Sequence, residues 1–183
     1  MIEKLKANDR TAFNELVALY KNNVINTCYR FLLDKEDAED VSQDVFVEVY
    51  QSIHSFRGDS KISTWIYRIA VTKSLDAIKK RNRKKRISSI GKILHIDEVT
   101  NWIAGGKQPD ADLETSDSFL IINKILNQLP DNQRIAFTLS KIDGFTNQEI
   151  SEIMKTTTIA VESLIYRAKK KVTSDLSLIK KND

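Results

Sequence analysis

The 183-residue sequence has few of the residues that cross-link or interrupt secondary structure. Its single cysteine, Cys28, excludes an internal disulfide framework and fits a reducing compartment. No apolar run approaches the roughly 18 residues that a membrane-spanning helix requires. The first residues lack the apolar stretch of a signal peptide. We therefore expect a soluble protein of the cytoplasm, with no direct insertion into a membrane.

Residues that form tight turns are also scarce, with five glycines and two prolines. Strand-like alternation is missing, whereas apolar residues recur at helical spacing throughout. Hydrophobic residues make up 41% and charged residues 30%, a balance that suits a folded chain. The sequence predicts an all-α fold, and its net charge of +4 gives a small bias toward a polyanionic partner.

The helical pattern divides the chain into two small modules. Four helices are expected to fill the first 85 residues, and their apolar stripes run from Ala12 to Phe31, from Ala38 to Ile53 and from Ile62 onward. The first stripe includes Ala12, Leu16, Leu19, Val24, Ile25, Cys28 and Phe31. Irregular patterning with glycines and a proline predicts a linker at 87–113, with or without a turn or two of helix at 99–103. The modules are therefore predicted at 1–86 and 114–183.

The second module is expected to contain a helix-turn-helix at residues 146–171. Helical spacing begins near Phe119, Pro130 suits the first turn of the next helix, and Gly144 suits its C-terminal cap. Thr146 and Glu149 have capping-box spacing. The helix after them buries Ile150 and Ile153, and a polar break follows at 155–157. The next helix, from about Thr158 to Lys171, is predicted to bury Val161, Leu164, Ile165, Ala168 and Val172.

The outer face of this last helix has the residue types that duplex DNA requires. Small or polar residues at its start can enter the major groove, and cations farther along can anchor phosphates. The residues predicted to face outward are Ala160, Glu162, Ser163, Tyr166, Arg167 and Lys170. The alternative is a helical hairpin that simply packs, with Lys169–Lys171 as a solvated face.

An acidic face is predicted on the helix after residue 34. Opposite its apolar stripe lie Asp37, Asp40, Gln43, Asp44 and Val47. An exposed apolar residue such as Val47 is typical of a protein interface, so a basic protein partner is one interpretation. A solvated face and a metal site are the alternatives. The metal site is disfavoured because no histidine or cysteine joins the carboxylates and a straight helix cannot wrap a cation.

A dense basic block follows within about forty residues and contains Lys79, Lys80, Arg81, Arg83, Lys84, Lys85 and Arg86. Between the acidic and basic regions, aromatic, hydroxyl and cationic residues gather from Phe56 to Arg68. Such groups suit unpaired bases, which need stacking surfaces and edge contacts. For Trp65 a place in the core remains the alternative to stacking.

Two blocks of the chain, residues 37–84 and 129–172, resemble the extracytoplasmic-function (ECF) group of bacterial sigma factors. With the N-terminal helix, the resemblance covers nearly the whole chain apart from the linker. It implies that Asp37, Asp40, Gln43, Asp44 and Val47 dock on the β′ clamp helices of core RNA polymerase. It also implies that the linker threads into the enzyme's active-site channel and RNA exit path.

The same resemblance implies two sites on promoter DNA. The loop from Phe56 to Ser63 captures a flipped base of the melted −10 element, and the helix from Thr64 onward reads that region. The implied −10 residues are Phe56, Arg57, Asp59, Ser60, Lys61, Ser63, Trp65, Tyr67, Arg68, Thr72 and Lys73. The implied readers of the −35 element are Thr157, Thr158, Ala160, Glu162, Ser163, Tyr166, Arg167 and Lys170.

The sequence departs from the family pattern at two of these positions. Glu162 stands where a cation is common, and its carboxylate can accept a hydrogen bond from cytosine N4. Thr72 stands where many members have asparagine. These departures affect the promoter sequence that is preferred, not the mode of docking. An anti-sigma factor is a further partner that the family implies.

No catalytic constellation is apparent, because His54 and His95 lie apart and no Ser-His-Asp or Cys-His set surrounds them. We expect no enzyme, no cofactor and no metal. One alternative function is a helix-turn-helix regulator that binds duplex DNA without polymerase, which leaves the acidic helix and the aromatic loop without a role. The other is a helical adaptor that binds only proteins, with merely solvated basic blocks.

Overall fold

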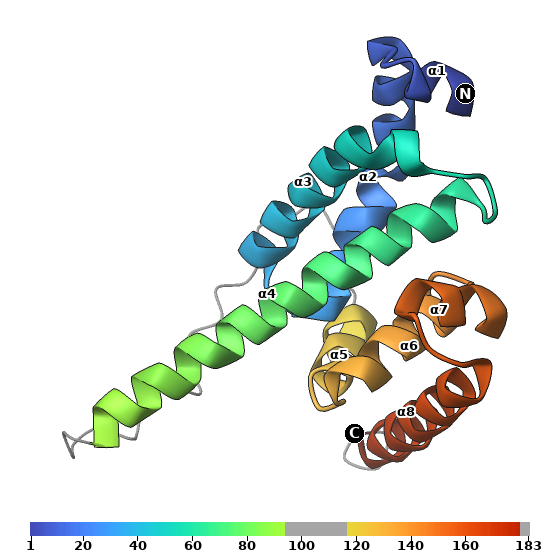
Figure 1. Ribbon diagram of the computed structural model, residues 1–183. Coiled ribbons are helices and arrows are strands. Elements are labelled where there is room, and N and C mark those ends of the chain that lie inside the picture. Colours follow the sequence, from blue (N-terminus) through green and yellow to red (C-terminus); the bar gives the residue numbers. More distant parts are fainter. Residues whose placement is uncertain (94–116, 180–183) are drawn as a thin grey trace.

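The structure is a computed structural model that describes the backbone of residues 1–93 and 117–179 and the side chains of 1–84 and 121–177. Within these ranges every regular element is a helix and no strand occurs (Figure 1). The predicted all-α fold is confirmed. The 94–113 part of the predicted linker, with the helical turn considered at 99–103, lies outside the described residues.

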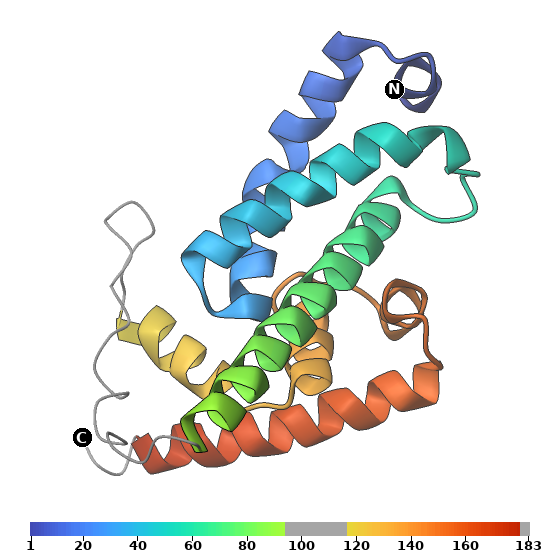
Figure 2. The same cartoon turned by 60° about the vertical axis from the view of Figure 1, so that its left-hand side comes forward.

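The first module contains α1 (Ile2–Lys6), α2 (Arg10–Leu32), α3 (Lys35–Ser52), the 3₁₀ helix η1 (Ile53–Ser55) and α4 (Ile62–Ile93). The turn between α2 and α3 is short because Leu33 adopts a left-handed conformation, φ 56°, and the Asp34 carboxylate then caps α3 at the Asp37 amide. Helices α2, α3 and α4 pack against one another (Figures 1 and 2).

The second module contains α5 (Asp117–Leu126), α6 (Asp131–Lys141), α7 (Asn147–Met154) and α8 (Thr158–Ile179). The predicted capping box is confirmed, because the Thr146 hydroxyl accepts from the Glu149 amide and the Glu149 carboxylate accepts from the Thr146 amide. Gly144 follows α6 at φ 75°, a left-handed backbone that glycine adopts without strain. Pro130 takes the N-cap of α6, one position before the predicted first turn.

Three details differ from the sequence-based expectation. Leu19, within the stripe predicted from Ala12 to Phe31 on α2, is 61% exposed instead of joining the core. Helix α4 continues past residue 86 to Ile93, into the segment predicted as linker, and α8 continues past Lys171. Helix propensity within a polar stretch extends both helices where no proline or cap interrupts them.

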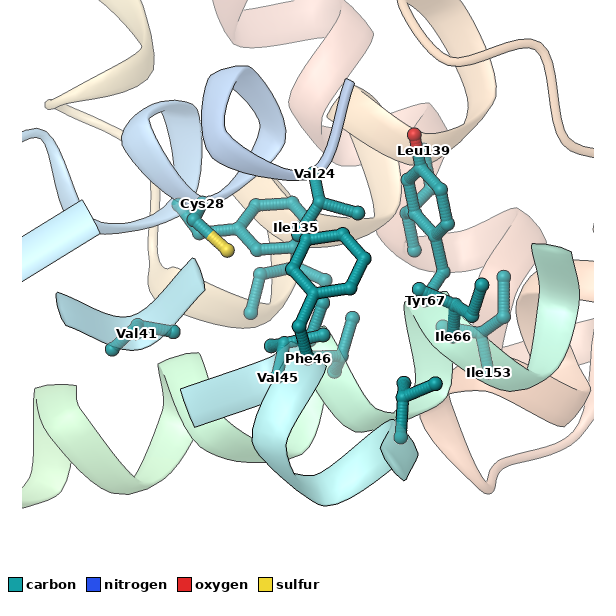
Figure 3. Packing of buried hydrophobic residues seen from close by; sticks show 14 of the residues in the cluster. Val24, Cys28, Val41, Val45, Phe46, Ile66, Tyr67, Ile135, Leu139 and Ile153 are labelled. Atoms are coloured by element: carbon teal, nitrogen blue, oxygen red, sulfur yellow. The ribbon is translucent and has the colours of Figure 1, made fainter. Parts of the chain in front are cut away.

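Most buried apolar side chains of the two modules form one shared hydrophobic core, and a small second cluster contains Leu126, Leu129 and Ala168. Figure 3 shows Val24, Ile66 and Tyr67 of the first module close to Leu139 and Ile153 of the second. The main contacts between modules join α4 to α7 and α2 to α6 (Figure 2). Full burial of such side chains contributes roughly 1.5–3 kcal/mol each, so this contact is a substantial part of the fold.

Candidate functional site

The exposed acidic face of α3 follows from the register of its buried stripe. Because Val41, Val45 and Val49 point into the core, Asp40, Gln43 and Asp44 point to solvent and Val47 is 54% exposed. Asp37 differs, since it is half-buried and its Oδ2 lies 3.5 Å from Arg81 Nη1 of α4. Four of the five predicted polymerase-binding residues therefore form a continuous free face.

A groove of about 710 Å³ runs beside this face between α2 and α3. Its apolar lining includes Phe13 and Tyr50, whose rings meet edge to face with centroids 5.0 Å apart. Gln43 and Val47 line the groove as well as the acidic face. The combined surface offers a partner both carboxylates and an apolar depression.

The loop before α4 is held by a buried aromatic pair. Phe56 is 4% exposed and its ring centroid lies 5.4 Å from that of Trp65, which packs against the core. The Phe56 ring is therefore not free for stacking in this arrangement, whereas the Trp65 ring is half-buried. Arg57 and Asp59 are exposed around Gly58, which turns the chain at φ 85°, whereas Ser60 and Ser63 are half-buried.

Two predicted −10 residues, one in α4 and one just before it, contact the second module. Tyr67 is 5% exposed and meets Phe145 edge to face at 4.7 Å between centroids, and Lys61 Nζ lies 2.8 Å from Glu149 Oε1. The lysine and the Thr146 groups hold the pKa of Glu149 down, at about 2.

The remaining predicted −10 residues of α4 lie away from this contact. Thr72 is exposed and donates to the Arg68 carbonyl oxygen, and Arg68 is half-buried. Lys73 Nζ lies 3.4 Å from Glu48 Oε2 of α3. Farther along α4, Lys79, Lys80, Arg83 and Lys84 cluster around Asp76 in a basic depression of about 320 Å³.

A buried arginine joins the modules through the backbone of α2. Arg134 of α6 is 4% exposed and donates from Nε to the Phe31 carbonyl oxygen at 3.0 Å. Its Nη1 donates to the Leu129 carbonyl oxygen at 3.2 Å and its Nη2 to Asp131 Oδ1 at 2.6 Å. Burial lowers the pKa of this guanidinium, although Asp131 opposes the shift. Each of the three nitrogen atoms of the guanidinium therefore donates one hydrogen bond, so three of its five N–H groups have a partner.

The outer face of α8 is largely exposed to solvent. Tyr166 is 70% exposed, Lys170 is exposed, and Arg167 Nη2 donates to Ser163 Oγ at 2.9 Å. Asn147 Nδ2 of α7 lies 3.5 Å from Glu162 Oε1. The helix start is fixed by Thr157, whose Oγ1 accepts from the Ala160 amide at 3.2 Å. Thr158 and Ala160 are half-exposed beside it. The predicted −35 residues therefore lie on α8 and at the residue before it, and Glu162, Tyr166, Arg167 and Lys170 are exposed.

Sequence reasoning missed one residue of these surfaces and two residues at the contact between the modules. Ile159 is 77% exposed among the predicted −35 residues, and only its position outside the apolar stripe of α8 signals this. Arg134 and Asp143 join the two modules, and no local pattern marks them.

Among the described residues, no group of three histidine, cysteine or carboxylate side chains could hold a metal. No helix in the same ranges combines the length and apolar character needed to cross a membrane.

The sequence and the fold of the chain are similar to those of known proteins. Residues 16–84 match the family described as Sigma-70 region 2, and residues 119–172 match Sigma-70, region 4. The ECF RNA polymerase sigma-E factor of Escherichia coli K12 is 31% identical over 177 residues, which cover 94% of this chain and 90% of that protein. The RNA polymerase sigma-H factor of Pseudomonas aeruginosa is 27% identical over 173 residues, with the same coverage.

Two solved structures share the fold. CnrH, in complex with the cytosolic domain of CnrY, has a TM-score of 0.70 at 21% identity and covers 97% of this chain and 95% of its own. The sigma factor RpoE of Bartonella quintana, in complex with the anti-sigma factor NepR, has a TM-score of 0.70 at 20% identity, with coverage of 91% and 97%.

A module that matches Sigma-70 region 2, followed by a helix-turn-helix module that matches Sigma-70, region 4, defines a promoter-recognising factor that works with RNA polymerase. Such a factor is not an enzyme. Sequence identity above 30% over nearly the full length then fixes the group: the chain belongs to the ECF sigma factors of the sigma-70 family.

Proposed function

We propose that three surfaces divide the work of promoter recognition in this sigma factor. The free acidic face of α3 docks on the β′ clamp helices of core RNA polymerase, the start of α4 and its preceding loop bind the melted −10 element, and the outer face of α8 reads the −35 duplex. The observation that carries the proposal is the simultaneous exposure of Asp40, Asp44 and Val47 on one module and of Tyr166 and Arg167 on the other.

Binding to the −35 duplex would combine base contacts with salt-sensitive phosphate contacts. Arg167, Lys169 and Lys170 are exposed and can neutralise phosphates, which releases counterions. Among the predicted −35 residues, Glu162 has the carboxylate that can accept a hydrogen bond from a cytosine amino group. If Arg167 contacts a base edge, Arg167→Ala weakens promoter binding by roughly 1–3 kcal/mol.

Binding to the −10 element by Tyr67 and Lys61 requires a change from the arrangement described above. Tyr67 is covered by Phe145, and Lys61 is paired with Glu149, so α7 must leave α4 before these side chains reach a base. Single-stranded bases bound to the freed surface would then shift the promoter toward its open form, because ligand binding favours the state with the higher affinity.

We also propose that the protein acts in the cytoplasm and that an anti-sigma factor controls it. Support for the second point comes from CnrH and RpoE, whose structures contain the cytosolic domain of CnrY and the anti-sigma factor NepR. The fold shared with those two proteins is the basis of the inference.

The polymerase assignment is tested by reversing the charge of Asp40 and Asp44 to lysine in the full chain. Both side chains are exposed, so the fold should be unaffected while the complex with bacterial core polymerase is lost. A matched control reverses Glu3 and Glu15, carboxylates of α1 and α2. Undiminished capture of polymerase by the Asp40/Asp44 variant would overturn the assignment.

A further inference from the structure

Ile159 has the largest exposed fraction among the exposed large hydrophobic residues of the described chain, at 77%. It is the second residue of α8. Tyr166, the next most exposed at 70%, lies seven residues later, a spacing of about two helical turns. The two side chains therefore share the outer face of α8, with Glu162 and Ser163 between them. An isoleucine in this place puts an exposed apolar group at the start of α8, one turn before Glu162 and Ser163.

The register of α8 imposes this exposure. Val161 and Ile165 are buried in the shared core on the opposite face, so the helix cannot rotate Ile159 inward without exposing them. The turn before the helix is fixed by Lys155, which adopts a left-handed conformation at φ 51°, and by the bond from the Ala160 amide to Thr157 Oγ1. Ile159 is thus held outward at the start of the helix by contacts that do not involve its own side chain.

We propose that Ile159 contacts the C5 methyl group of a thymine in the −35 element and thereby determines specificity at that base pair. The inference depends on the proposed assignment of α8 to the −35 duplex. In the major groove the thymine methyl is the apolar group that base edges present, and aliphatic or small side chains are its partners. A β-branched residue in a helix has one strongly preferred χ1 rotamer, so little side-chain entropy is lost when the contact forms.

The neighbouring acceptor predicts where that thymine lies. Ile159 and Glu162 are three residues apart, which corresponds to about 4.5 Å along the helix axis. Base pairs are stacked at about 3.4 Å intervals. Since Glu162 suits cytosine N4, the thymine and a cytosine are expected one or two base pairs apart, on the same strand or on opposite strands. The contact of Glu162 with Asn147 holds this carboxylate beside the groove-facing surface.

The first arm of the test selects promoters from a library randomised in the −35 element, with the full chain bound to core polymerase. The wild-type chain should select thymine at one position near a selected cytosine, and Ile159→Ala should lose that preference while keeping the others. Ile122→Ala is the matched control, because Ile122 is an exposed isoleucine of the same module, on α5. Neither substitution should destabilise its helix, since alanine has the higher helix propensity.

The second arm replaces the selected thymine by deoxyuridine, which removes only the methyl group. The affinity of the wild-type holoenzyme should fall about fourfold, the value for one buried methyl-sized group. The affinity of the Ile159→Ala holoenzyme should not change. Equal binding of thymine and deoxyuridine by the wild type, with a defined −35 sequence still selected, overturns the role of Ile159 and leaves the assignment of α8 intact. Selection of no −35 sequence at all overturns both.

Discussion

Thr27 on α2 donates from Oγ1 to both carboxylate oxygens of Asp143, at 3.0 and 3.1 Å, across the contact between the two modules. Thr27 is fully buried, and Asp143 lies in the loop that follows α6. Burial raises the pKa of Asp143 from 3.8 to about 6, although Thr27 and Arg30 favour the charged form. A carboxyl group that titrates close to neutrality therefore sits where the modules meet.

The packing of the modules should depend on pH through Asp143. A carboxyl group with a raised pKa in the packed state binds its proton more tightly there, so protonation stabilises the packing. The contribution of protonated Asp143 to the unfolding free energy is fully present below pH 3.8 and is lost as the pH rises through about 6. The difference in unfolding free energy between wild type and Asp143→Asn should change by roughly 1–3 kcal/mol across that window. Urea unfolding at a series of pH values measures it.

Asparagine is the suitable replacement because it keeps an oxygen acceptor for Thr27 and removes the charge. Glu149 has the opposite effect, because its pKa is lowered from 4.5 to about 2. Its contribution to the unfolding free energy is therefore present above pH 4.5 and is lost as the pH falls to about 2. A wild-type minus Asp143→Asn difference that stays constant between pH 4 and pH 7 would show that Asp143 is not buried at the contact.

Two substitutions at Glu149 should distinguish the stability that comes from capping α7 from the stability that comes from the ion pair with Lys61. Glu149→Ala removes the capping box of α7 together with the bond to Lys61 and should lower the unfolding free energy by about 0.5–1.5 kcal/mol. Glu149→Gln retains a side chain that fits the box and should cost less. Thermal unfolding in low and high salt distinguishes the contributions, because only the ionic one is screened. Equal losses for the two variants at both salt concentrations would contradict this division.

Arg134 should not be replaceable by lysine. A lysine has a single ammonium group and cannot serve the Phe31 carbonyl, the Leu129 carbonyl and Asp131 from the positions of the planar fork. Arg134→Lys is expected to lower the unfolding free energy by about 1–3 kcal/mol and to loosen the modules. Urea unfolding and small-angle scattering measure the two effects. Arg167→Lys, at an exposed position, is the control and should change stability by no more than about 0.5 kcal/mol.

Loss of the Phe145 ring should make the −10 surface more accessible. The Tyr67–Phe145 pair holds α4 against the segment before α7, and such pairs contribute about 0.5–1.5 kcal/mol beyond burial. Phe145→Ala should therefore raise affinity for a single-stranded −10 oligonucleotide about two- to tenfold, as measured by fluorescence anisotropy. Phe13→Ala, which removes the Phe13–Tyr50 pair within the first module, should not. Unchanged or weaker binding by Phe145→Ala would mean that this contact does not restrict access.

Local signals were sufficient to predict most of the fold. The apolar spacing on α3 placed Asp40, Asp44 and Val47 on the free face, and the capping box fixed the start of α7. The register of Val161, Ile165 and Ala168 placed Tyr166 and Arg167 outside. These features depend on residues within a few turns of one another, so their periodicity is visible in the sequence.

The packing of the modules could not be predicted in the same way. The ring contact between Tyr67 and Phe145 joins residues that are 78 positions apart in the chain. The sequence around either residue contains no pattern that predicts this contact. Arg134 lies on a helix of the second module, and one of the acceptors that compensate its burial, the Phe31 carbonyl oxygen, belongs to the first module 103 residues earlier. Ile159 is a single apolar residue outside the helical stripe, and such residues are common on protein surfaces.

Promoter-specific transcription by purified components tests the central claim most directly. The full chain is added to bacterial core RNA polymerase with genomic DNA fragments, and the 5′ ends of the transcripts are mapped. The account predicts a stable complex with core enzyme and start sites that share −35 and −10 sequences at fixed spacing. Absence of a complex, or transcripts that start without any shared upstream sequence, would contradict it.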